Sequence, residues 1–259
     1  MAYTDDLIGA HTARELCCAF TTAAPGLPLR ALAATIPEAG TGTLRSRSDA
    51  LRRALLVDLP WRYADLAALV RATHRSAALF RGWMLLPVTM AVAARACDDG
   101  TPAAFDDAMA LLGEITGRFT SEFALRPMLT HDLARGLGIA RDWAGSPDED
   151  LRRLAVAGTR PHLPWGRHVP AILLSPSVTV PILDLLHHDP TEYVRRPVAD
   201  HLADLARQDP QLAVRTAARW FERPDDDLRR LVEWGLRRLV RQGHPDACQL
   251  LVSRVSVRR

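Results

Sequence analysis

The chain contains no lysine, because each of its 33 basic residues is an arginine. This absence excludes Schiff-base chemistry on a lysine side chain and a Walker-type phosphate loop. Arginine suits bidentate contacts with phosphate better than lysine does. A GC-rich genome that replaces lysine throughout is the alternative explanation of the same composition.

Signals for metal binding, disulfides and membrane insertion are also lacking. Cys17, Cys18, Cys97 and Cys248 have no metal-ligand spacing, and the adjacent pair is a poor disulfide framework. The sequence has no N-terminal signal peptide and no apolar run of membrane-spanning length. We therefore expect a reduced, cytoplasmic protein without a metal.

Residues that favour strands are scarce. Leu and Ala dominate the 48% of apolar residues, aromatic residues make up 6%, and no stretch alternates with period two for long. Apolar residues at helical spacing predict helices over residues 3–22, 44–56, 63–73, 85–96 and 105–129. The stretch 25–48, rich in Pro, Gly, Thr and Ala, predicts mostly loop.

One seven-residue phrase occurs three times, at 147–153, 190–196 and 224–230. The copies lie 43 and 34 residues apart, which is the period of helical-pair repeats. Each copy predicts the start of a helix, since Ser146 and Asp189 place a capping side chain before a proline.

The repeats predict an all-α fold, a curved α-solenoid of HEAT-like helical-pair repeats with an irregular N-terminal helical cap. We expect a single domain over residues 1–259. The cap is expected over residues 1–100, and the repeat array that carries the site over residues 101–259.

Each copy of the phrase ends in two arginines, and a repeated pair predicts a basic stripe for a phosphate backbone. The net charge is only +3, and the whole excess lies from Ser121 onward. Acidic residues 225–227 weaken the stripe at the last copy.

The first arginine of each pair fits the structural ladder of HEAT repeats, in which it pairs with an acid of the neighbouring repeat. The ladder arginines are Arg152, Arg195 and Arg229. The second arginine of each pair points to a different side of the helix and is a candidate for phosphate contact.

Three segments, 118–127, 158–167 and 195–204, place unusual residues near the repeat starts. Through these three segments the chain resembles the AlkC branch of the AlkC/AlkD-type HEAT-like DNA alkylation-repair glycosylases. The resemblance extends over roughly residues 44–250. The resemblance implies base excision repair by a monofunctional glycosylase without lyase activity or cofactor. Such an enzyme hydrolyses the N-glycosidic bond of cationic N3-alkylated bases (3-methyladenine, 3-methylcytosine) in double-stranded DNA, without base flipping.

The chemistry of such a reaction needs few groups. A base alkylated at a ring nitrogen is cationic and leaves as a neutral molecule, so no general acid is required. A carboxylate stabilises the oxocarbenium ion of the sugar and activates water, and an indole face holds the sugar. By motif position the catalytic residues are Asp204, which faces the sugar, Trp165, which stacks on it, and Glu122, which completes the anionic patch. The DNA-backbone candidates are Arg126, Arg153, Arg160, Arg167, Arg196 and Arg230.

Structural alternatives exist for the three catalytic candidates. Glu122 can pair with Arg118 or Arg126 on one helix, Trp165 can pack within its loop, and Asp204 can be a solvated surface acid.

The chain departs from the family pattern at three positions. Asp200 stands where relatives usually carry Asn, and His162 and His168 where they usually carry Arg. An extra acid and two lost charges predict weaker, pH-dependent DNA binding.

The alternative functions are a catalytically silent DNA-binding module and a protein-binding HEAT scaffold. We expect a monomer.

Overall fold

The structure is a computed structural model that describes residues 7–37, 42–221 and 225–252. The described residues form helices and short 3₁₀ turns and contain no strand, which confirms the all-α prediction. Contacts between Cα atoms divide the chain into two compact units, Met1–His131 and Asp132–Arg259. Each unit is described by itself below.

The first unit contains seven α-helices and one 3₁₀ turn among its described residues. They are α1 (Ala10–Ala23), α2 (Arg30–Ala34), α3 (Leu44–Asp58), α4 (Tyr63–Ser76), η2 (Gly82–Met84), α5 (Leu85–Asp99), α6 (Pro102–Ile115) and α7 (Glu122–His131). Residues 3–6 of the first predicted helix lie outside the described residues. The pattern over 105–129 is two helices, because a turn over 116–121 separates α6 from α7.

Helix α5 is the centre of the first unit, since α3, α6 and α7 all pack on it. Residues 101–131 are therefore grouped with the N-terminal helices. The division into a cap over 1–100 and an array over 101–259, within one domain, stays a prediction.

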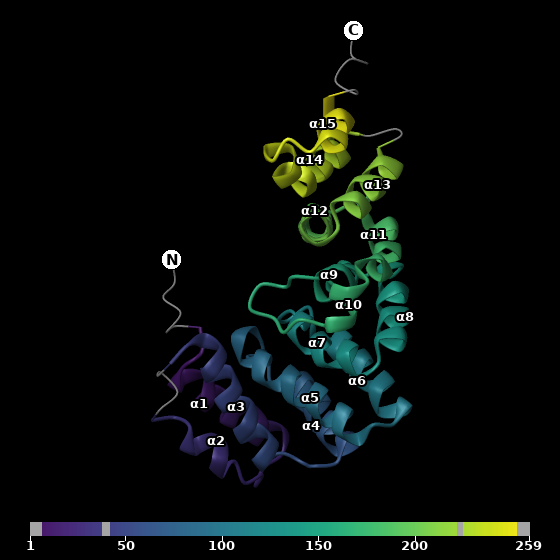
Figure 1. Cartoon of the computed structure of the whole chain (residues 1–259). Helices are drawn as coiled ribbons and strands as arrows, with labels where there is room; N and C mark the ends of the chain where they lie inside the picture. The colour runs from purple at the N-terminus through teal and green to yellow at the C-terminus, as the bar shows by residue number, and fades with distance from the viewer. Residues whose placement is uncertain (1–6, 38–41, 222–224, 253–259) are drawn as a thin grey trace. The chain divides into compact units, whose positions relative to one another are not determined.

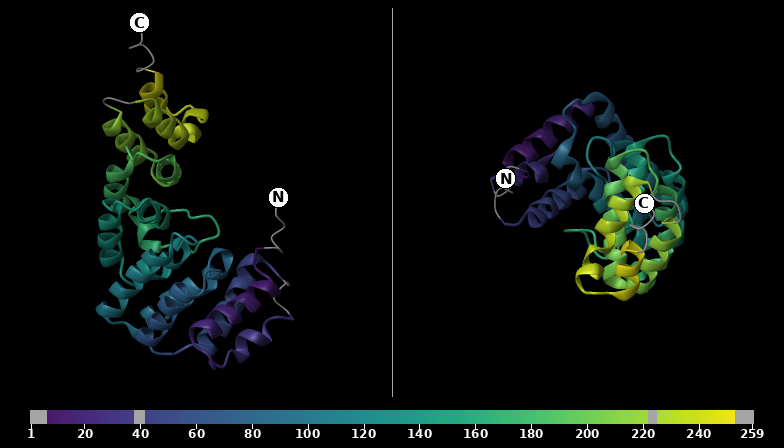
Figure 2. Two further views of the ribbon diagram at one scale, coloured as in Figure 1. Left: turned by 180° about the vertical axis from the view of Figure 1, so that it is seen from behind. Right: turned by 90° about the horizontal axis from the view of Figure 1, so that it is seen from above.

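The second unit contains the three repeated phrases. Its elements are α8 (Leu133–Ala144), α9 (Glu149–Gly158), α10 (Pro170–Leu174), η3 (Pro176–Thr179), α11 (Val180–Leu186), α12 (Glu192–Gln208), α13 (Pro210–Trp220), α14 (Asp226–Arg241) and α15 (Pro245–Val252). Helices α9, α12 and α14 pack side by side, while α8, α11 and α13 form a second column beside them, on the right in Figure 1 (Figure 2, left, shows the same columns from behind).

Buried aliphatic residues hold the two columns together. Leu202 of α12 and Leu236 of α14 are fully buried in one cluster with Leu183 of α11 and Ala217 of α13. Gly235 lets α14 approach α12 closely, because a Cβ at this position would lie 2.5 Å from Cδ2 of Leu202. The column of α9, α12 and α14 is therefore a tightly packed helix layer.

The helices start two residues later than the phrase predicts. Helix α9 is capped by Asp148, whose Oδ1 accepts a hydrogen bond from the Asp150 N–H, and Ser146 Oγ accepts from the Asp148 N–H instead. Asp189 likewise accepts from the backbone N–H of Thr191, the residue before α12. The predicted capping side chains therefore stabilise the turns that lead into the helices. Pro224 of the third copy lies outside the described residues.

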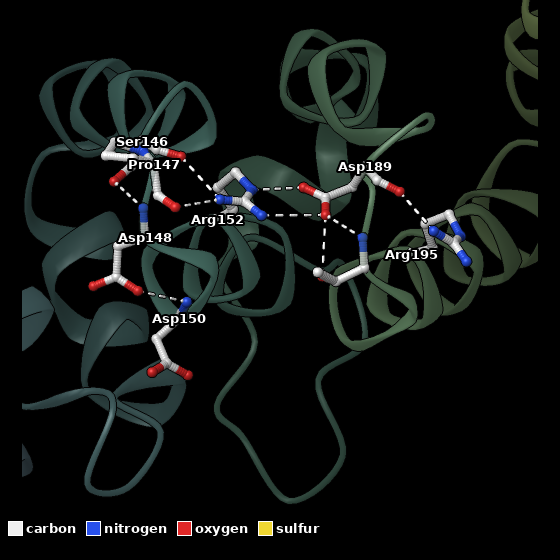
Figure 3. A network of polar contacts seen from close by, with 8 residues as sticks. Ser146, Pro147, Asp148, Asp150, Arg152, Asp189 and Arg195 are labelled. Atoms are coloured by element: carbon white, nitrogen blue, oxygen red, sulfur yellow. Dashed lines mark hydrogen bonds and ion pairs between the residues drawn. The ribbon is translucent and has the colours of Figure 1, made fainter.

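The arginine ladder is confirmed for two of its three members. Arg152 donates from Nε to Oδ2 of Asp189 at 2.6 Å and from Nη2 to Oδ1 at 3.3 Å (Figure 3). Arg195 donates to the Asp189 carbonyl at 2.7 Å and pairs with Asp227 at 2.8 Å. These contacts join α9, α12 and α14 in sequence order. The guanidinium of Arg229 lies 5.9 Å from the ring centroid of Phe221, and its place in the ladder stays a prediction.

Candidate active site

Two carboxylates one turn apart on α12 form the centre of the candidate site. Asp200 and Asp204 are four residues apart, so they share one face of the helix. The opposite face carries Val194, Val198 and Leu205, which are fully buried. This packing fixes the rotation of α12 about its axis and directs the two acids toward the segment that follows α9.

Arg160, two residues after the end of α9, lies between these acids. Its Nε donates to Oδ2 of Asp204 at 2.8 Å, and its Nη1 donates to Oδ2 of Asp200 at 3.4 Å. The side chains of Arg160 and Asp204 are only 14% and 12% exposed. The three residues, named the Arg160 cluster below, tie α9 to α12. Arg160 was expected to contact the DNA backbone. In the structure its guanidinium pairs with Asp204 and Asp200.

The Arg160 cluster gives Asp204 an unusual environment. Burial raises the pKa of the Asp204 carboxyl above its ordinary value, and it outweighs the lowering effect of Arg160 and of His162. The backbone N–H of His162 also donates to Oδ2 of Asp204, at 3.4 Å. Asp204 is therefore not a solvated surface acid.

Trp165 lies in the loop between α9 and α10, which projects from the α9 side of the unit (Figure 1). Its φ of 61° is in the left-handed region, which a bulky residue seldom adopts and which costs about 1–3 kcal/mol. Gly166 follows because a Cβ there would lie 2.8 Å from Cδ2 of Leu163. The Trp165 side chain is 71% exposed, so it does not pack within its loop.

Glu122 and Arg126 belong to the first unit. Glu122 is the first residue of α7 and is half-buried, and its N–H donates to Oγ1 of Thr120 at 3.3 Å. Its predicted place beside Asp204 stays a prediction. Arg126 is 1% exposed. Such burial is incompatible with a phosphate contact, which corrects the expectation that Arg126 binds the DNA backbone.

The other predicted DNA-binding arginines are in the second unit. The Arg153 guanidinium lies 5.0 Å from the ring centroid of Tyr193, and Arg167 is exposed in the Trp165 loop. Arg196 and Arg230 are exposed and line a groove of about 450 Å³ between α12 and α14. Arg230 also pairs with Asp227. Four arginines thus remain candidates for phosphate.

The chain is similar to known proteins in sequence and in structure. No protein-family model matches the chain. The uncharacterized protein YhaZ of Bacillus subtilis (strain 168) is 31% identical over 211 residues, which are 80% of this chain and 56% of YhaZ. The chain thus spans a little over half the length of this relative.

A solved structure resembles nearly the whole chain. It is the alkylpurine DNA glycosylase AlkC of Pseudomonas fluorescens, bound to DNA that contains an abasic site analog. The TM-score is 0.80 at 26% identity, over 97% of this chain and 68% of that chain. Over nearly its whole length the chain is thus similar to an AlkC-type glycosylase. Its fold is accordingly a helical-repeat solenoid.

Asp200, which we expected to depart from the family pattern, is bound from two sides. Oδ2 faces Arg160, and Oδ1 accepts a hydrogen bond from Nε1 of Trp234 at 2.9 Å. Trp234 lies on α14, with the Arg237 guanidinium 3.7 Å from its ring centroid. Sequence reasoning missed Trp234. The available signal was a tryptophan in an otherwise charged surface stretch of α14, 34 residues from Asp200.

The two histidines that we expected to replace arginine, His162 and His168, lie together in the loop before α10. The His162 and His168 rings meet edge to face with centroids 5.6 Å apart. A ring nitrogen of His162, Nε2, lies 3.1 Å from Oε1 of Gln208 on α12. The loop is thus attached to α12 on both sides of Asp204.

Metal-ion sites and membrane-spanning helices are both absent from the described residues. No group of three or more His, Cys, Asp or Glu residues is placed to hold a metal ion in the part of the chain that the structure describes. None of the described helices is long and apolar enough to cross a membrane.

Proposed function

We propose that the chain is a DNA glycosylase that hydrolyses the N-glycosidic bond of cationic N3-alkylated bases, 3-methyladenine and 3-methylcytosine, in duplex DNA. The observation that carries the proposal is the buried Asp204 carboxylate, held by Arg160 beside an exposed tryptophan loop. The similarity to AlkC supports DNA alkylation repair as the process.

The proposed reaction needs no acid on the leaving group. The C1′–N bond breaks with its electron pair going to the base, so the cationic base leaves neutral. Positive charge then builds up on the sugar, and the Asp204 carboxylate stabilises it. A water adds to C1′ and gives its proton to Asp204. Because Arg160 and His162 both donate to Oδ2, we assign the water to Oδ1. The products are an abasic site and the free base.

Trp165 and Glu122 have supporting roles in this proposal. The exposed indole of Trp165 packs against the deoxyribose, and its strained backbone fixes the direction in which the ring points. Since the indole projects into solvent on a loop, we propose that the lesion stays in the helix stack. Glu122 adds negative charge beside the sugar. The chain has no lysine for a Schiff base, which supports a monofunctional enzyme.

The test is release of methylated bases from methylated duplex DNA, measured by chromatography, for the wild type and for Asp204→Asn. We expect the wild type to release 3-methyladenine and Asp204→Asn to be slower by about 100-fold or more, with similar DNA affinity. Glu233→Gln is the matched control, because it removes one exposed acid from α14 and should retain full activity.

Two outcomes contradict the proposal. Salt-sensitive DNA binding without release of any base would indicate a DNA-binding module. Absence of DNA binding at low salt would favour a protein-binding scaffold.

A further inference from the structure

The Arg160 cluster contains two carboxylates for one guanidinium. With both acids ionised, Arg160, Asp200 and Asp204 together carry one net negative charge. The two acids use different nitrogens of Arg160, at 3.4 Å for Asp200 and 2.8 Å for Asp204. A relative with Asn at position 200 would have a neutral cluster instead. Asp200 therefore determines whether the cluster is anionic.

Trp234 holds Asp200 in this arrangement. Its indole N–H donates to Oδ1 of Asp200 at 2.9 Å, which leaves Oδ2 directed at Arg160. The close approach of α12 and α14 at Gly235, the next residue, brings the indole within reach. Arg237 over the ring restricts its rotation. The Asp200 side chain is 32% exposed, so without this donor it would have water as a competing partner.

We propose that Asp200 and Trp234 are positioning residues that keep the candidate active site anionic. Asp200 shares the Arg160 guanidinium, so that Asp204 is held in place without being neutralised, and Trp234 fixes Asp200 for this task. The inference rests on the proposed function, since it assigns the retained charge to the stabilisation of a cationic sugar. Other ionisable groups near the cluster include His162 in the α9–α10 loop, Arg196 one turn before Asp200 on α12, and Arg237 on α14.

The experiment compares the affinity of the protein for two duplexes with abasic-site analogues. One contains a pyrrolidine, which is cationic at the position of the sugar, and the other a neutral tetrahydrofuran. A site that stabilises an oxocarbenium ion prefers the cationic analogue. We expect Asp200→Asn to reduce this preference about tenfold, the effect of one unit charge several ångströms away in a partly solvated site. Affinity for the neutral duplex should stay the same or increase.

Two further variants separate charge from structure. Trp234→Phe keeps an aromatic ring but removes the donor, and we expect it to reduce the preference two- to threefold. In the Asp200→Asn background it should have no further effect, because the two residues act in one unit. Glu192→Gln removes the same charge two turns before Asp200 on α12, beyond a Debye length at 0.15 M salt, and should leave the preference unchanged.

The possible failures are distinguishable. If the wild type releases bases but does not prefer the cationic duplex, or if Asp200→Asn retains the preference, the inference is overturned and the proposed function stands. If the wild type releases no base yet shows the preference and its loss in Asp200→Asn, the anionic cluster stands without catalysis. Additive effects of Asp200→Asn and Trp234→Phe would overturn the role of Trp234.

Discussion

Asp204 illustrates how a single residue combines opposing physical effects. Burial disfavours the charged form of its carboxyl, while the Arg160 guanidinium and the His162 N–H favour it. The balance leaves the pKa raised above that of an ordinary aspartate. A carboxylate in this state is poorly hydrated, so its charge acts strongly on a cation bound beside it.

The raised pKa predicts the acid limit of the reaction. As the pH falls through this pKa, Asp204 takes up a proton and loses the charge that stabilises the sugar. Base release should therefore decline at a pH above about 4, the usual value for Asp. The measurement is the rate of release against pH, corrected for spontaneous loss of base. A rate that stays constant down to pH 4 would contradict the role of Asp204.

The raised pKa of Asp204 also affects the stability of the fold. Low pH should lower activity, but it favours folding through this group. A raised pKa in the folded state means that folding favours the protonated acid. Stability from this group is present at low pH and is lost as the pH rises through the folded pKa. The residue that we assign to catalysis thus opposes folding at neutral pH, as functional carboxylates commonly do.

Single residues were predictable from the sequence to an uneven degree. The motif identified Asp204 and Trp165, whose burial and exposure are unlike those of a surface acid and a packed tryptophan. It failed for Arg126, because arginine is usually exposed and the burial of α7 depends on its packing against α5 and α6. Trp234 was missed for the same reason, since its contact with Asp200 is tertiary.

At the scale of the helices, the Arg152–Asp189 pair holds the register between α9 and α12. The Asp189 side chain is 2% exposed and that of Arg152 is 12% exposed. Burial by itself would raise the pKa of Asp189, but hydrogen bonds from Arg152 and Thr191 hold it below the ordinary value. Arg152 also donates to the carbonyls of Ser146 and Pro147, so it closes the turn before α9 as well (Figure 3).

Asp189→Asn should strongly destabilise the second unit. Removal of one partner leaves a buried guanidinium uncompensated, which costs about 3–5 kcal/mol. A lowered pKa gives stability that is present above the unfolded pKa and lost as the pH falls through the folded pKa. Urea unfolding at pH 7 should therefore show the full difference from the wild type, and unfolding below about pH 4 a smaller one.

Glu149→Gln provides the control for this substitution. It removes an exposed acid from the first turn of α9, where loss of the favourable interaction with the helix dipole costs less than about 1 kcal/mol. A difference between wild type and Asp189→Asn that is equal at both pH values would show that packing, and not the ion pair, stabilises the contact.

At the scale of the helices, sequence reasoning located the repeats but not their first residues. The proline phrase marks the turns before α9 and α12 correctly because proline and the short polar residues favour that conformation. Where the helix then begins depends on which side chain reaches a free N–H group. Asp148 and Asp225 do so for α9 and α14, a choice between neighbouring acids that composition does not determine.

For the whole molecule, the distribution of charge matters more than its sum. The net charge is only +3, and several arginines are neutralised within the fold by Asp189, Asp227, Asp200 and Asp204. Arginines that remain exposed on the α9–α12–α14 side, such as Arg196, are therefore the groups that can replace counterions on DNA. Arg141 is exposed too, but it lies on α8 in the second column.

This distribution predicts the salt dependence of DNA binding. Each phosphate contact contributes about 0.9 to the slope of log affinity against log salt concentration. Arg196→Ala should reduce the slope by about that amount and weaken binding equally for DNA with and without a lesion. Arg141→Ala removes the same charge from the molecule and should leave the slope unchanged. Equal losses from both variants, measured by fluorescence anisotropy between 50 and 200 mM salt, would mean that net charge alone controls binding and that the helix column does not form the DNA interface.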